Sequence, residues 1–458
     1  MSFNSLLLMS DGLSQALQLL AGLSFLIVLH EFGHFFFARL FKTRVEKFYL
    51  FFDFLFPFSG LLNFSLFKKT VGGTEYGIGW FPLGGYVKIA GMVDESMDKE
   101  ALAKPPEPWE YRSKKAWQRL LIMMGGIIMN VLIAIGLYMI IFGVWGDNYT
   151  PVANAKYGIA TDSVGYFIGF RDGDQIKVID GKQIKRLEEV PLALILHDKN
   201  ATITVNRNGA DTTFKIPDGS IRLMIKKKGN PIAARKPATI DSVLPKSIAL
   251  QAGFLMGDSI ISVNNEAVPY GVDFMRYRVS HEGAPLAIAY LRNGKIDTIH
   301  TLAPKDSILG MMVGYPKRYS VHETFTPVAA IGKGVSVAFD RFRIYMAQFK
   351  LFLSPEVKIN QSVGGFYSMG QMYNAEFNWL DFLNLTAFIS IALAFMNLLP
   401  IPGLDGGYVI FLLFEMITGK QVSEKFMEKA TTVGLVLLLG LMVYVNGLDI
   451  LKIFGVKF

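Results

Sequence analysis

The sequence predicts a polytopic α-helical membrane protein of about four transmembrane helices, with a membrane-associated β-hairpin or sheet and two inserted soluble α+β modules. Three observations predict this fold class. The chain of 458 residues is 51% hydrophobic with a mean hydropathy of +0.34, which is too apolar for a soluble protein. Several apolar runs are long enough to cross a bilayer core of about 30 Å. The region 150–310 differs from them, because short strand-like pieces alternate with Asn-Gly and Asp-Gly turns.

The first predicted span, Ala16–Ala38, carries His30, Glu31 and His34 inside an apolar run. Histidines four residues apart lie on one face of a helix, so both rings can reach one metal ion, with Glu31 beside them. Ionisable groups at membrane depth cost about 3 kcal/mol each or more, so we expect them to face a protein interior or a water-filled cavity. The alternative is that two core histidines share hydrogen bonds with a buried glutamate. Cysteine is absent, so any metal must use histidine and carboxylate ligands.

Three further apolar runs complete the predicted set of spans. They are Leu120–Val144, Phe382–Leu399 (which continues after a break into Tyr408–Phe414) and Thr432–Val445. Lysine and arginine gather between the first two spans, so the positive-inside rule puts residues 40–118 in the cytoplasm and both termini outside. Membrane topology therefore accounts for the net charge of +8, which indicates contact with a lipid bilayer and no nucleic-acid partner.

The cytoplasmic segment contains two unusual stretches. Phe48–Phe67 is aromatic but interrupted by Asp53 and Pro57, so we expect it to dip into the membrane interface without crossing. In Gly72–Gly91, short strand-like pieces are punctuated by glycines that would let another backbone approach closely. An edge strand here could pair with an extended peptide. The alternative is a glycine-rich hairpin without a ligand.

The region 150–310 contains an internal repeat. Six residues of the first copy recur 84 positions later in the second: Ser163, Gly169, Phe170, Gly173, Asp174 and Ile176 match Ser247, Gly253, Phe254, Gly257, Asp258 and Ile260. The pattern resembles the PDZ domain, closely in the second copy and less closely in the first, where Gly165 interrupts the expected helix. The two modules either bind peptides by strand addition or form a spacer pair that blocks access to the membrane.

After the repeats, apolar residues at 3-4 spacing over Val328–Phe352 predict an amphipathic helix lying on the outer membrane surface. A core helix packed against the repeat modules is the alternative. The domains predicted from these boundaries are 1–149 (two spans and the β element), 150–235 and 236–318 (the two modules), 319–358 (the amphipathic helix) and 359–458 (the last two spans).

The stretch Phe395–Gly407, FMNLLPIPGLDGG, places Asn397 and Asp405 around two prolines at the end of an apolar span. Proline breaks the helix, and unwound backbone at membrane depth is tolerated only where it is buried in protein or lines a water-filled cavity. By itself this stretch could be a broken transporter helix that holds an ion. Together with His30 and His34, however, Asp405 completes two histidines and one carboxylate, a catalytic zinc set with one position open for water.

At this point the chain resembles the site-2 protease family of intramembrane metalloproteases over almost its whole length. The resemblance is carried by His-Glu-Phe-Gly-His at 30–34, Pro-Leu-Gly-Gly-Tyr-Val-Lys at 82–88, the two PDZ-like modules, and Asn-x-x-Pro-x-Pro-x-Leu-Asp-Gly at 397–406. It implies that Zn²⁺ is bound by His30, His34 and Asp405. It also implies that Glu31 is the general base and that Asn397 contacts the substrate backbone or an oxyanion.

The resemblance implies further substrate-binding residues. Asn130 ends the stretch Gly-Gly-Ile-Ile-Met-Asn (125–130), which corresponds to a second-span pattern of the family but lacks its proline. Gly84, Gly85 and Tyr86 fall in an element similar to the membrane-reentrant β-loop of the family, so this loop is expected to receive the extended substrate.

The implied function is intramembrane proteolysis of single-span transmembrane substrates in the bacterial inner membrane. Anti-sigma factors already trimmed outside by another protease, and signal-peptide remnants, are the implied substrates. The modules would lie on the outer side and the active site toward the cytoplasm; no oligomeric state is predicted. A catalytically silent PDZ adaptor would have lost Glu31 or a ligand, and an ion-coupled transporter would repeat its spans. Neither feature is found, so the protease is favoured over both.

Overall fold

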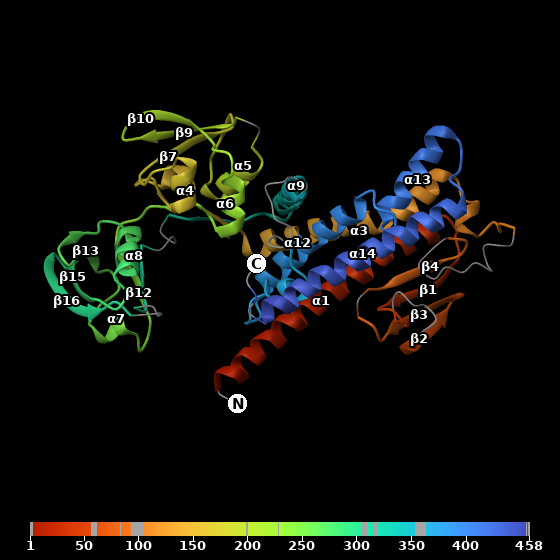
Figure 1. Cartoon of the computed structure of the whole chain (residues 1–458), viewed down its shortest axis with the longest axis horizontal. Coiled ribbons are helices and arrows are strands. Elements are labelled where there is room, and N and C mark those ends of the chain that lie inside the picture. The colour runs from red at the N-terminus through yellow and green to blue at the C-terminus, as the bar shows by residue number, and fades with distance from the viewer. Residues whose placement is uncertain are drawn as a thin grey trace. The chain divides into compact units, whose positions relative to one another are not determined.

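The computed structural model describes residues 3–55, 62–82, 84–92, 105–197, 200–227, 229–304, 309–314, 319–352, 363–454 and 456 (Figure 1). The chain divides into two compact units. The first combines Met1–Gly146 with Thr324–Phe458, and the second is Asp147–Glu323. Each unit is described by itself.

Within the described residues, four helices of the first unit are long and apolar enough to cross a membrane, which confirms the predicted polytopic membrane protein. They are α1 (Phe3–Leu40), α3 (Ala116–Trp145), α12 (Trp379–Leu398) and α14 (Glu424–Ile453). Helix α3 is central, because α1, α9, α12 and α13 all pack against it. The predicted continuation of the third span is a separate helix, α13 (Asp405–Thr418), since Pro400 and Pro402 stop α12.

The predicted amphipathic segment forms α9 (Pro327–Phe352), which packs along α3 and α12 within the first unit. Its Ala338 is buried in a cluster with residues of both helices. Gly334 permits close approach to α3, because a Cβ there would lie 2.9 Å from the Met139 backbone nitrogen. The position of α9 at the membrane surface stays a prediction. A short helix, α11 (Phe366–Gly370), precedes α12.

The predicted β element is a four-stranded sheet in the order β2-β3-β1-β4. Its strands are β1 (Val45–Leu50), β2 (Ser65–Val71), β3 (Thr74–Gly79) and β4 (Tyr86–Ile89). Strands β1 and β3 run parallel, and the other pairs are antiparallel. Strand β4 therefore forms one edge. Part of the stretch predicted to dip into the interface, residues 56–61, lies outside the described residues, as does Leu83.

The second unit contains two copies of one fold, each with a four-stranded sheet of the same strand order. The first copy comprises β6 (Ile159–Thr161), α4 (Ser163–Ile168), β7 (Gln175–Ile179), β8 (Lys182–Gln183), α5 (Val190–Ile195), β9 (Thr202–Arg207), β10 (Ala210–Lys215), α6 (Ser220–Lys227) and β11 (Ile232–Ala234). The second comprises β12 (Ile240–Val243), α7 (Ile248–Gln251), β13 (Ser259–Val263), β14 (Glu266–Ala267), α8 (Gly271–Ser280), β15 (Pro285–Arg292), β16 (Lys295–Leu302) and β17 (Met311–Val313). The order β10-β9-β7-β8 matches β16-β15-β13-β14, and β6 pairs β11 as β12 pairs β17. Strands β5 (Asp147–Tyr149) and β18 (Val321–Glu323) pair where the chain enters and leaves the unit.

The repeated Gly-Asp has a structural role in both copies. The buried carboxylate of Asp174 accepts hydrogen bonds from Arg207, and that of Asp258 accepts them from Arg292. Burial by itself would raise the pKa of Asp258, but the Arg292 guanidinium and the Leu255 N–H hold it below its usual value. Each copy therefore has the same ion pair. It joins the hairpin β9-β10 to the loop before β7, and the hairpin β15-β16 to the loop before β13.

The first copy forms a helix where the sequence is least regular. The Asp162 carboxylate caps α4 by accepting hydrogen bonds from Val164 N–H (2.8 Å) and Gly165 N–H (2.9 Å). Gly165 is required by packing, because a Cβ there would collide with the Thr161 side chain and lie 2.6 Å from the Pro231 carbonyl. The glycine therefore lets α4 sit against β6 and the chain entering β11.

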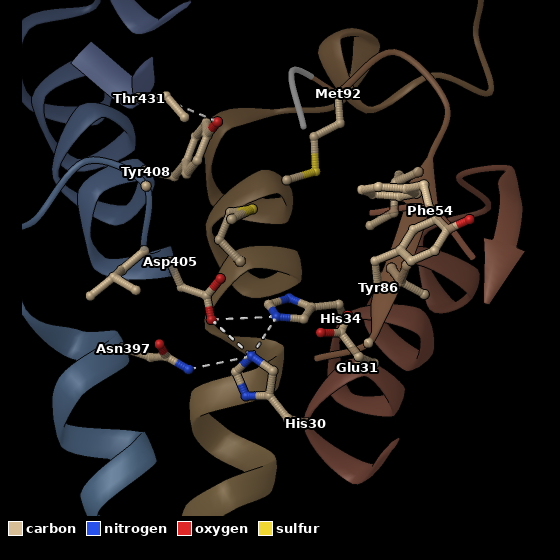
Figure 2. A pocket seen from close by; sticks show the side chains of 16 residues that line it. His30, Glu31, His34, Phe54, Tyr86, Met92, Asn397, Asp405, Tyr408 and Thr431 are labelled. Atoms are coloured by element: carbon tan, nitrogen blue, oxygen red, sulfur yellow. Dashed lines mark hydrogen bonds and ion pairs between the residues drawn. The ribbon is translucent and has the colours of Figure 1, made fainter. Parts of the chain in front are cut away.

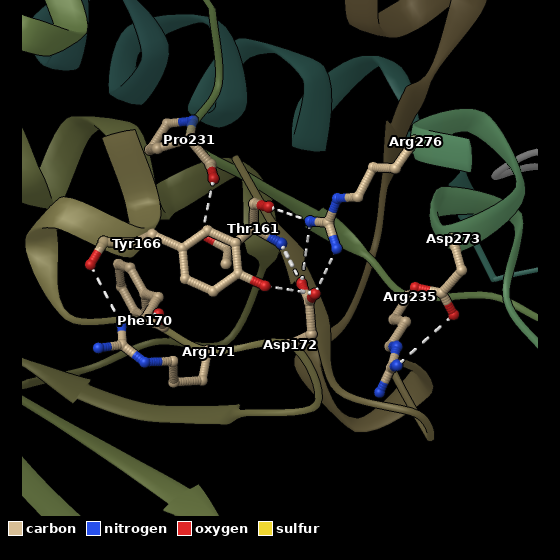
Figure 3. Close-up of polar contacts among 9 residues, drawn as sticks. All are labelled: Thr161, Tyr166, Phe170, Arg171, Asp172, Pro231, Arg235, Asp273 and Arg276. Atoms are coloured by element: carbon tan, nitrogen blue, oxygen red, sulfur yellow. Dashed lines mark hydrogen bonds and ion pairs between the residues drawn. The ribbon is translucent and has the colours of Figure 1, made fainter. Parts of the chain in front are cut away.

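Ion pairs join the two copies within the second unit (Figure 3). Arg276 of α8 donates to the Asp172 carboxylate and to the Thr161 carbonyl of the first copy. The Tyr166 hydroxyl donates to the same carboxylate at 2.6 Å. Burial opposes ionisation of Asp172, but these donors hold the pKa of its carboxyl below the usual value. Asp172 is thus a charged junction between the copies.

Candidate metal centre

The site is built where α1 crosses α3 at two glycines. A Cβ on Gly33 would collide with the backbone of Gly125, and a Cβ on Gly125 would collide with that of Gly33. Only glycine lets two helix backbones approach this closely. One residue further along α3, a Cβ on Gly126 would lie 2.6 Å from both His30 Nδ1 and His34 Nε2. The two imidazoles therefore rest directly on the backbone of α3.

Three side chains converge at this crossing (Figure 2). His30 Nε2 and His34 Nε2 lie 3.3 Å apart, and each lies 3.4 Å from Asp405 Oδ2. The histidines come from α1, and Asp405 is the first residue of α13. The break at Pro400 and Pro402 allows this, because it ends α12 and lets the chain turn before Asp405. Residues far apart in sequence thus form one group that could hold a metal ion.

The donor atoms fit a zinc ion. In a tetrahedral site with bonds of about 2.0–2.1 Å, two ligand atoms lie about 3.3 Å apart, which is the spacing of this triangle. Asp405 Oδ2 is buried, and among the described residues no hydrogen-bond donor satisfies it. A cation would satisfy it, since buried carboxylate oxygens are normally paired or coordinate metals. The chemistry of two imidazole nitrogens and one carboxylate oxygen matches catalytic zinc sites.

The ring of His34 is fixed in the orientation that metal binding needs. His34 Nδ1 lies 2.8 Å from the Ile122 carbonyl oxygen on α3. A carbonyl only accepts, so Nδ1 carries the proton and Nε2 presents its lone pair to the triangle. On the other ring, His30 Nδ1 lies 3.2 Å from Nδ2 of the Asn130 side-chain amide.

The triangle opens into a cavity of about 210 Å³. Glu31, Gly85, Tyr86 and Asn397 line it together with the three triangle residues. The Asn397 amide nitrogen lies 3.4 Å from His30 Nε2, so a hydrogen-bond donor faces the reactive side of the triangle. Strand β4 supplies one wall of the cavity and α1 another. The arrangement combines a metal-binding group, a carboxylate and a polar donor in one cavity.

Two of the nine predicted site residues do not line this cavity. Asn130 is fully buried on α3 and touches His30 Nδ1. Gly84 lies against an aromatic ring, because a Cβ there would be 2.6 Å from the Phe52 side chain. The other seven predicted residues meet in the cavity.

Sequence reasoning missed several cavity and crossing residues. Tyr408 and Thr431 line the cavity, and their hydroxyl oxygens lie 3.3 Å apart. No pattern in the sequence marks either of them. Gly33 and Gly125 could have been found, because small residues in apolar spans often mark close helix crossings.

Comparison with known proteins agrees with this geometry. The model of peptidase family M50 matches residues 18–441. The chain is similar to a protein of Vibrio cholerae named "Putative zinc metalloprotease", with 29% identity over 95% of this chain and 98% of that protein. It is also similar to the regulator of sigma-E protease RseP of Escherichia coli, with 28% identity, and to protease RseP of Yersinia pestis, with 30% identity. Each of these two matches covers 93% of this chain and 96% of the other protein. The family match spans both ends of the metal-binding group, so this chain belongs to peptidase family M50 and is a zinc metalloprotease of the site-2 type.

Proposed function

We propose that this protease hydrolyses a peptide bond inside single-span transmembrane proteins, with zinc held by His30, His34 and Asp405. One observation carries the proposal: the zinc-fitting triangle shares its cavity with Glu31 and with the edge strand β4. A carboxylate and a strand edge beside a metal are the parts that peptide hydrolysis requires.

The roles of the residues follow from their chemistry. Zinc, when bound, supplies a Lewis acid that lowers the pKa of water and polarises a carbonyl. Glu31 accepts a proton from the attacking water on its carboxylate and passes it to the nitrogen of the leaving amine. The Asn397 side-chain amide donates a hydrogen bond toward the carbonyl oxygen of the scissile bond, supported by its place 3.4 Å from His30 Nε2.

Strand β4 is proposed to receive the substrate in extended form. It pairs with β1 on one side, and no described strand pairs with its other side. A substrate helix satisfies its own backbone groups, so it must unwind locally before hydrolysis, and an edge strand replaces the lost hydrogen bonds. Gly85 and Tyr86 line the cavity at the start of this edge.

The relatives named regulator of sigma-E protease support a substrate class. Substrates are proposed to be anti-sigma factors that another protease has trimmed outside the membrane, as well as signal-peptide remnants. The enzyme would then act in regulated proteolysis for a stress response at the bacterial inner membrane. The proposed domains are those predicted above, with both repeat copies as PDZ-like modules on the outer side.

The active site is proposed to lie toward the cytoplasmic side. His30 precedes Ala38, the inner end of the predicted first span, by about 12 Å along the helix. The modules are proposed to act as a size filter that rejects substrates with an intact outer domain. A size filter does not require peptide binding. The proposal therefore holds whether the modules bind peptides or only block access to the membrane.

One experiment tests the cleavage and the filter together. Purified protein in detergent or liposomes is given a single-span substrate with or without a folded outer domain, and products are mapped by mass spectrometry. We expect cleavage of the trimmed substrate alone, in the inner half of its span. Deleting residues 155–305 is expected to permit cleavage of the untrimmed form as well. Cuts outside the span would contradict the proposed function, whereas continued rejection after the deletion would contradict only the filter.

A further inference from the structure

Asn130 touches a metal-site imidazole without lining the cavity. Its side chain is fully buried on α3, and its amide nitrogen lies 3.2 Å from His30 Nδ1. The cavity lining contains His30 but not Asn130. A residue in this place can act on the ring but cannot reach a substrate in the cavity.

The proton on the ring decides what Asn130 does. His30 offers Nε2 to the triangle, and a nitrogen that binds a metal must present a lone pair. A neutral imidazole has one N–H, so the proton is then on Nδ1 and needs an acceptor. An amide with Nδ2 toward the ring offers a donor instead, and it leaves Oδ1 buried without a partner in the part of the chain that the structure describes. Turning the amide by 180° brings Oδ1 to the Nδ1 proton and removes the conflict at the ring.

The surroundings fix Asn130 and the ring against each other. The Ser390 hydroxyl of α12 donates to the Asn130 backbone carbonyl at 2.7 Å, and Ser390 is itself fully buried. Gly126, one helical turn before Asn130, carries the His30 ring on its bare backbone. The imidazole is therefore held by a glycine beneath it and an amide at its edge.

We propose that Asn130 is a positioning residue, whose Oδ1 accepts the Nδ1 proton of His30 and directs Nε2 toward the metal. Acceptors of this kind fix the tautomer of a metal-binding histidine and raise its basicity. Asn130 thus acts through His30, in place of the substrate contact that the family resemblance implies. The inference rests on the zinc site of the proposed function.

Two substitutions separate acceptor, donor and substrate contact. Asn130→Leu keeps the approximate volume and removes the acceptor, whereas Asn130→Asp keeps acceptor oxygens and removes the donor. Asn384→Leu is the matched control, because the Asn384 amide donates a hydrogen bond within its own helix α12, to the Leu380 carbonyl. The readouts are zinc affinity by chelator competition, the absorption spectrum of the cobalt-substituted protein, and kcat and KM at saturating zinc.

We expect Asn130→Leu to weaken zinc binding about 10–100-fold and to alter the cobalt spectrum, with KM changed less than about twofold. Asn130→Asp should bind zinc at least as tightly as the parent, and Asn384→Leu should match the parent. Parent-like zinc affinity with a raised KM in Asn130→Leu would overturn the inference in favour of substrate contact. Weaker zinc binding by Asn130→Asp than by the parent would also overturn the inference. If the leucine variant does not fold, this comparison of the aspartate variant with the parent decides. A parent protein that binds no zinc would instead refute the proposed function.

Discussion

Replacing Glu31 with glutamine is expected to abolish peptide hydrolysis while zinc binding remains. Glu31 lines the cavity beside the triangle but contributes none of its three ligand atoms. Glutamine has nearly the same shape, yet it cannot accept a proton from water at neutral pH. Loss of a general base costs about 10²–10⁴ in rate. The measurement is the initial rate on a trimmed single-span substrate, together with zinc content by mass spectrometry.

The control for this prediction is Glu376→Gln, which changes an exposed glutamate of the same unit. That variant should cleave like the parent. Cleavage at the parent rate by Glu31→Gln would show that another group takes the proton. Loss of zinc from Glu31→Gln would instead give Glu31 a structural part in the metal site.

Adding one methyl group at Gly126 is expected to destroy the metal site. The Cβ of alanine would lie 2.6 Å from both His30 Nδ1 and His34 Nε2, so at least one ring must leave its position. Neither imidazole can shift freely, because each is held by a hydrogen-bonding partner on α3. Zinc affinity should fall by at least about 100-fold, or about 2.8 kcal/mol, in addition to an overpacking cost of about 1–3 kcal/mol to folding.

Gly136→Ala is the matched control, because Gly136 lies on the same helix and none of the described residues comes within 4 Å of the added Cβ. It should keep parent zinc affinity and should stabilise α3 slightly, since alanine favours a helix over glycine by about 1 kcal/mol. Zinc affinity and thermal unfolding are measured for both variants. Parent-like zinc affinity in Gly126→Ala would mean that the rings do not rest on α3.

The parts of this structure that depend on local pattern could be predicted from the sequence. Hydropathy locates the spans, and the spacing of His30 and His34 puts both rings on one face of α1. That Asp405 lies beside these histidines could be inferred only from metal chemistry. A zinc site with two histidines needs a third ligand, and Asp405 offers a carboxylate after a broken span. Seven of the nine site residues that the sequence patterns and the family resemblance predicted line one cavity.

Contacts between distant segments could not be predicted in the same way. Nothing in the sequence indicates that β1 and β3 pair in parallel, or that α9 packs along α3. The contact between Asn130 and His30 depends on how two helices cross, which is set by Gly33 and Gly125. Gly165 illustrates the same limit. A side chain is excluded there because the Pro231 carbonyl, from another segment, lies too close.

Zinc stoichiometry in purified protein, compared between the parent and Asp405→Ala, tests the central claim most directly. Asp381→Ala, an exposed aspartate at the start of α12, serves as the control. We expect one tightly bound zinc per chain in the parent and in the control, and loss of tight binding in Asp405→Ala because one of three protein ligands is gone. A parent without zinc, or an Asp405→Ala protein that holds zinc as tightly as the parent, would contradict the account.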